Sequence, residues 1–105
     1  MENKGQAIEK IKSFSELKNN WDGQGAFAIS EIAINNAIKI IESIAKIMPD
    51  DIDPDADGGI VFWFYQNDGK SMGLFIHNDD TFTSIYYDKN YEITSFIDHF
   101  DIEAI

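Results

Sequence analysis

The segment that decides the fold lies between residues 60 and 87 and has the sequence IVFWFYQNDGKSMGLFIHNDDTFTSIYY. It contains three runs rich in aromatic and β-branched residues, which are typical of strands. Between them lie QNDG (66–69) and NDD (78–80), whose composition is typical of tight turns. The sequence therefore predicts an antiparallel meander of three strands over residues 60–65, 71–77 and 81–87.

Two amphipathic helices are predicted before the meander. The first has apolar residues at helical spacing and ends at Asn19-Asn20. The second begins at Ser30, whose hydroxyl is a suitable N-cap, and ends at Pro49, which cannot continue a helix. Its polar stripe is narrow, so we expect most of its circumference to be buried. The apolar residues of the first helix are Ala7, Ile8, Ile11, Phe14 and Leu17.

The end of the chain also has apolar residues at helical spacing, namely Ile93, Phe96, Ile97, Phe100 and Ile105, with Asp98, Asp101 and Glu103 around the rest of the wheel. This spacing predicts an acidic C-terminal helix, and a fourth strand is the alternative. A length of 105 residues fits one domain over residues 1–105. We therefore expect an α+β fold: two N-terminal helices packed on a three-stranded, possibly four-stranded, antiparallel meander, followed by an acidic C-terminal helix.

The net charge of −11 comes entirely from residues 49–105. Such a field disfavours nucleic acid and anionic membranes and favours encounter with a basic surface. The chain has no cysteine, so it has neither disulfides nor a thiolate metal site. It also shows no signal peptide and no run long enough for a membrane span. These features predict a cytoplasmic protein.

The meander gathers acidic residues at one end of the sheet. The loop that enters the first strand and the turn between the second and third strands lie at the same end. We therefore expect His77 to lie beside a cluster of five aspartates, while Asp68 and Asp88 lie at the opposite end. The five are Asp53, Asp55, Asp57, Asp79 and Asp80.

Both faces of the predicted sheet are apolar, although only one can cover the helices. In the first strand Ile60, Phe62 and Phe64 alternate with Val61, Trp63 and Tyr65. The second face is exposed unless the terminal segment folds back over it. Aromatic rows with a polar rim are typical of interface cores. The expected anchors for a partner are Trp63, Tyr65, Phe75, Tyr86 and Tyr87.

Residues 53–60, DPDADGGI, match the opening of an EF-hand calcium loop, including its turn glycine. The bidentate acid is missing because Phe64 stands at its position, and a strand rather than a helix follows. The sequence thus favours an ordinary acidic loop and no metal site. A calcium-binding module that uses Asp53, Asp55 and Asp57 is the alternative.

Catalysis is not expected. His77 and His99 are the only histidines, and neither belongs to a motif that activates a nucleophile. His77 near Asp79 and Asp80 could shuttle a proton, but a histidine beside turn aspartates is more often solvated or hydrogen-bonded. We expect no enzymatic activity and no cofactor.

The segment NWDGQGA (20–26) predicts a specific tight loop. A role for Trp21 in closing the core, with Asp22 capping backbone amides, is favoured over a role as a binding anchor. With Pro54, DGGI (57–60) and Trp63, this loop resembles a scattered group of small bacterial and phage proteins. Their shared pattern is NWDGxGA, a helix and a P-x-x-DGGI-x-x-W strand. The resemblance covers about residues 15–65 and implies accessory genes of mobile elements, with antitoxin, immunity or anti-defence roles.

Carboxylates at phosphate-like density can occupy the basic groove of a nucleic-acid-binding protein. We therefore expect a small, acidic, non-catalytic inhibitor, resembling an anti-CRISPR, antitoxin or immunity protein. Its partner would be a basic protein such as a nuclease toxin or a nucleic-acid-binding defence complex. The alternatives to such an inhibitor are the calcium-binding module and a homodimer formed through the exposed sheet face.

Overall fold

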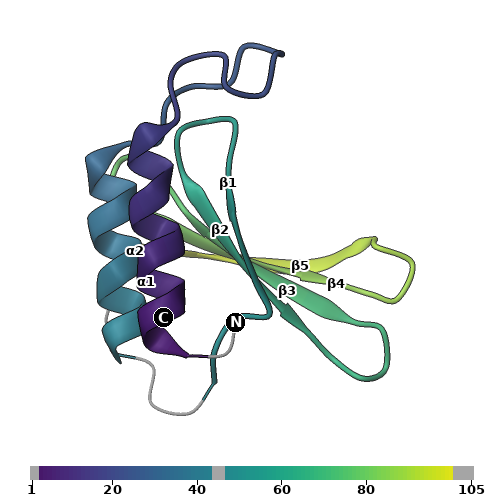
Figure 1. The fold of residues 1–105 in the computed structure, drawn as a ribbon. Coiled ribbons are helices and arrows are strands. Elements are labelled where there is room, and N and C mark those ends of the chain that lie inside the picture. The colour runs from purple at the N-terminus through teal and green to yellow at the C-terminus, as the bar shows by residue number, and fades with distance from the viewer. Residues whose placement is uncertain (1–2, 44–46, 101–105) are drawn as a thin grey trace.

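An antiparallel sheet of five strands packs with one face against two helices (Figure 1). The computed structural model describes residues 3–43 and 47–100. The helices are α1 (Lys4–Ser13), continued by the 3-10 turn η1 (Phe14–Glu16), and α2 (Glu31–Ser43). The strands are β1 (Asp51–Pro54), β2 (Ile60–Tyr65), β3 (Ser71–Ile76), β4 (Phe82–Tyr87) and β5 (Ile93–His99), and their order in the sheet is their order in the chain.

The prediction of an α+β fold with two N-terminal helices is confirmed, but the number of strands and the C-terminal helix were wrong. The acidic stretch before residue 60 contains β1. This strand has a single core residue, Ile52, which is fully buried and pairs with Phe62. Four residues with one apolar side chain are too few to show the period of two that identifies a strand.

The segment expected to be a helix is β5, which pairs with β4 along its whole length. Positions 93, 96 and 97 suit helical spacing, but Ile93, Thr94 and Ile97 are β-branched and favour a strand. A bulge at Thr94 shifts the register between Tyr86 and Tyr87, which hides the alternation. Asp101, Glu103 and Ile105, also assigned to that helix, lie outside the described residues.

All four hairpin turns share one geometry. In each, the first N–H donates to the fifth residue's carbonyl, as from His77 to Thr81 over 3.0 Å, and the fourth residue has a positive φ. The turns predicted at 66–69 and 78–80 are confirmed. The residues with positive φ are Gly58, Gly69, Asp80 and Tyr91.

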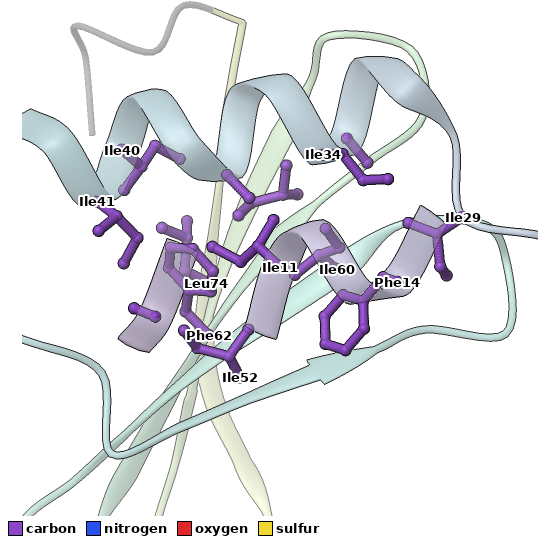
Figure 2. Packing of buried hydrophobic residues seen from close by; sticks show 14 of the residues in the cluster. Ile11, Phe14, Ile29, Ile34, Ile40, Ile41, Ile52, Ile60, Phe62 and Leu74 are labelled. Carbon is purple, nitrogen blue, oxygen red and sulfur yellow. The ribbon is translucent and has the colours of Figure 1, made fainter. Parts of the chain in front are cut away.

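The core lies between the helices and one face of the sheet, where side chains from both helices and from β1, β2 and β3 meet (Figure 2). Phe62, Ile60 and Ile52 of the sheet are inaccessible, as are Ile11 and Ile41 of the helices. The predicted N-cap is confirmed, because the Ala33 N–H donates to Ser30 Oγ over 3.0 Å. Within the described ranges, no helix has the length and apolar character needed to cross a membrane.

We expect replacement of Tyr91 by asparagine to stabilise the protein. Tyr91 has φ 64° and an 82% exposed side chain, so it is strained without compensating burial. Asparagine tolerates this left-handed conformation, and Tyr91→Asn should raise the free energy of unfolding by about 1 kcal/mol in urea titrations. Gly69 has the same position in its own turn and supplies the control. Gly69→Ala at φ 88° should lower the free energy of unfolding by about 1 kcal/mol. A destabilised Tyr91→Asn protein would contradict this account of the turn.

Candidate functional site

The candidate site is the sheet face turned away from the helices, which we call the open face. Strand alternation and the register of pairing place on it the odd-numbered residues of β1 to β4, together with Phe96 and Asp98 of β5. Four of the expected anchors share this face: Trp63, Tyr65, Phe75 and Tyr87. Tyr86 lies on the helix side, because adjacent residues of a strand point to opposite faces.

The centre of the open face is an aromatic cluster around Trp63. Its indole meets Phe75 edge-on, with ring centroids 5.7 Å apart, and lies 5.8 Å from the ring of Tyr87. Gly73 makes this arrangement possible, because a Cβ there would stand 2.8 Å from Trp63 Cζ3 and from Phe75 Cε2. The three rings are half-buried against one another. Partial burial also raises the pKa of the Tyr87 phenol.

One margin of the open face is the acidic strand β1. Tyr65 Oη donates to Asp51 Oδ2 over 3.2 Å, and the Tyr65 N–H donates to Asp50 Oδ2 over 2.7 Å. The pKa of Tyr65 is raised, first by loss of solvation and then by the hydrogen bond to Asp51 and the negative charges of Asp51, Asp53 and Asp50. This margin therefore has a negative potential.

The five aspartates expected at one edge do not form a single cluster. Asp57 and Asp79 lie with His77 at the end of the open face. Asp53 belongs to the β1 margin, and Asp55 is half-buried within the first hairpin turn. Asp80 turns toward α2, where its carboxylate accepts from Asn36 Nδ2 over 2.6 Å. Asn36 was not anticipated, because contacts between a helix and a distant turn leave no periodic signal.

A chain of polar contacts crosses β3, β4 and β5 at this end. His77 Nδ1 lies 3.8 Å from Asp57 Oδ2, and His77 Nε2 lies 2.8 Å from Thr83 Oγ1. Thr83 Oγ1 donates to Asp98 Oδ1 over 2.9 Å. Asp98 thus joins the acidic end of the open face, which was not foreseen because its segment was expected to be helical.

His77 does not accept the Thr83 proton in this arrangement. A catalytic hydroxyl gives its proton to the histidine, as in a hydrolase triad. Here the Thr83 proton is directed to Asp98, so the Nε2–H of His77 is the donor to Thr83. The site adjoins an open hollow of about 490 Å³, lined in part by Asp57, His77, Asp79, Asp98 and Phe100.

Turn carboxylates at this end also cap backbone amides. Asp57 Oδ1 accepts from the Gly59 N–H over 2.8 Å. Hydrogen bonds from the Thr81 hydroxyl and N–H lower the pKa of Asp79. Among residues 3–43 and 47–100, no group of three or more aspartate, glutamate or histidine side chains is arranged to hold a metal ion. The geometry therefore offers no support for the calcium loop at Asp53, Asp55 and Asp57.

The NWDGQGA loop has the structural role favoured by its sequence. Trp21 packs against the core and its Nε1 donates to the Phe27 carbonyl over 2.8 Å. Asp22 Oδ1 accepts from the backbone N–H groups of Gln24 and Ala26, which lowers the pKa of Asp22. The loop lies in the connection between η1 and α2, outside the open face.

Comparisons of this chain with models of protein families, with curated proteins and with solved structures find no match. The resemblance to the group of proteins with the NWDGxGA pattern stays a prediction.

Asp55→Asn should stabilise the protein near neutral pH. Burial, followed by the charge of Asp57, raises the pKa of Asp55 above its ordinary 3.8. At pH values between 3.8 and the pKa of Asp55 in the folded state, the folded protein binds more protons than the unfolded chain. Its stability therefore falls as the pH rises through that range. The half-exposed amide should raise the free energy of unfolding at neutral pH by less than about 1 kcal/mol. The gain should vanish below pH 3.8, and a gain that persists there would contradict this cause.

Gly73→Ala should disturb the aromatic cluster. The new methyl group forces the Trp63 indole and the Phe75 ring to move, which should cost about 1–3 kcal/mol of stability and change the near-ultraviolet circular dichroism. Gly5→Ala in α1 is the matched control, because its nearest contact is the Asn3 side chain at 3.3 Å. An unchanged aromatic spectrum in Gly73→Ala would show that Trp63 does not rest on Gly73.

Proposed function

We propose that this protein binds a basic surface of another protein through the open face and blocks that surface without catalysis. The observation that supports this proposal best is the solvent-accessible aromatic cluster between two groups of carboxylates. Trp63, Phe75 and Tyr87 provide apolar contact area, while Asp51 and Asp53 lie along the β1 margin and Asp57, Asp79 and Asp98 lie at the His77 end of the open face.

The aromatic cluster has the composition of an interface core. Trp63 and Tyr87, which are half-buried, combine large apolar surfaces with polar atoms, which suits a contact that is dry at its centre and wet at its rim. Their mutual packing holds the rings in place before a partner arrives, so little side-chain entropy remains to be lost on binding.

The charge of the open face points to a basic partner. None of the five strands contains a lysine or arginine. In the second half of the chain the only cations are Lys70 and Lys89, which lie in turns at the end of the sheet away from His77, and Lys70 is 3.8 Å from Asp68. Such a surface accelerates encounter with a basic partner and repels phosphate groups. A nuclease toxin or a nucleic-acid-binding defence complex has the required chemistry.

The alternatives receive less support from the same geometry. Pairing of two open faces would bring together two chains of charge −11 and would oppose their acidic margins. A histidine-activated nucleophile is not supported at Thr83, because its proton is directed to Asp98 and not to His77. Binding and occlusion require neither symmetry nor a reactive group.

The proposal predicts that charge on the open face controls binding. The double variant Asp51→Asn, Asp53→Asn keeps side-chain size but removes two charges from the β1 margin. Partner capture from bacterial lysate, with association rates measured on the recovered protein, should show association about tenfold slower and less sensitive to salt.

The matched control is the double variant Glu9→Gln, Glu16→Gln on the helix side, where both side chains are exposed. It makes the same change in net charge and should bind like the unaltered protein. Equal slowing by both variants would show that only total charge matters. A recovered partner that is acidic, or whose binding ignores salt, would refute the proposal.

A further inference from the structure

The two outer strands of the sheet differ in how well they resist pairing with another chain. Natural edge strands are protected by short length, proline and charge. β1 has four residues, contains Pro54, and exposes Asp51 and Asp53. β5 has seven residues, lacks proline and lysine, and its one carboxylate is Asp98. In the described part of the chain, no strand pairs with the outer side of β5.

The side chains of β5 are exposed on both faces of the sheet. Ile93 is 61% exposed, and Phe96 on the open face is 65% exposed. Ile97, which points to the helix side opposite Ser84, is 49% exposed. A strand added beside β5 would cover apolar surface on both faces at once, which contact with the open face alone would not achieve.

The backbone of β5 presents a row of hydrogen-bonding groups to that outer side. The Asp88 N–H donates to the Glu92 carbonyl in the turn, and the register pairs Ser84 with Ile97. Because hydrogen-bonded and non-hydrogen-bonded positions alternate in antiparallel pairs, the backbone groups of Phe96 and Asp98 point away from β4. The ligand complementary to such a row is an extended chain.

Charge decides which extended chain fits. A second copy would oppose two chains of charge −11 and add a second acidic strand beside the first. A basic strand would instead bring lysine or arginine near Asp98 and the ring of Phe96, where both ionic and cation–π attraction are available. Apolar residues of the same strand would lie beside Ile97 on the other face.

We propose that β5 is a strand-addition site, whose outer edge pairs with an extended segment of the partner in which basic and apolar residues alternate. This inference rests on the proposed function, since it names the part of the basic partner that is recognised. The open face and the outer edge of β5 meet at Phe96 and Asp98, so one partner can contact both.

The probe is a capped peptide in which Val-Lys is repeated four times, titrated into ¹⁵N-labelled protein. We expect shift changes concentrated in β5 and slower amide exchange at Phe96 and Asp98. The same peptide with N-methyl groups along its pairing edge keeps charge and composition but cannot form the ladder, and it should bind about tenfold more weakly. Equal binding of the two peptides, or no binding of either, would overturn strand addition.

A pair of lysine variants locates the binding site. Ile97→Lys places a charge on the exposed side of β5 and should weaken peptide binding about tenfold. Ile32→Lys, at a 43% exposed position of α2, makes the same chemical change on a helix and should have no effect. Equal effects of the two variants would overturn the assignment to β5.

Two further outcomes separate this proposal from the one on which it rests. Shift changes confined to Trp63 and Phe75 would overturn strand addition while supporting the open face as the basic-partner site. A dimer of the protein alone in sedimentation, abolished by Ile97→Lys, would make a second copy the occupant of β5 and would overturn pairing with a basic strand. The association rate of the double variant Asp51→Asn, Asp53→Asn and its dependence on salt test the proposed function independently of either result.

Discussion

The alternation of β2 is the constraint on which the rest of the structure depends. Ile60 and Phe62 enter the core beneath the helices, so Val61, Trp63 and Tyr65 must point to the other face. Two helices can cover only one side of a sheet, and both sides of this strand are apolar. The open face is therefore a direct consequence of how the core is built.

Gly73 and the hairpin turns fix the positions of the aromatic rings and the carboxylates on the open face. The missing side chain at Gly73 lets the Trp63 indole lie across β3, and the neighbouring rings then hold it in place. The turns bring carboxylates to the margins, where Asp57 and Asp79 accept hydrogen bonds from backbone amides. Apolar contact area and negative charge are thus positioned by separate local interactions, so each can be altered without removing the other.

The two outer strands of the sheet are the elements that the sequence did not predict. The central strands are recognised from aromatic and β-branched runs between turn residues. β1 has one core residue, Ile52, and is held as a strand by its pairing with β2. β5 has a bulge at Thr94 that breaks its alternation, so spacing suggested a helix. Edge strands receive pairing from one side only, and their own sequences contain correspondingly little of the information that places them.

The sequence by itself determined the two helices, the central meander, its tight turns and the concentration of charge in the second half of the chain. These depend on neighbours within a few residues, through capping, turn preference and periodicity. Only the tertiary structure decided that Asp80 turns to Asn36, that Asp98 joins His77 through Thr83, and that Tyr86 leaves the open face. Those outcomes depend on register and on contacts between residues distant in the chain, which local patterns do not specify.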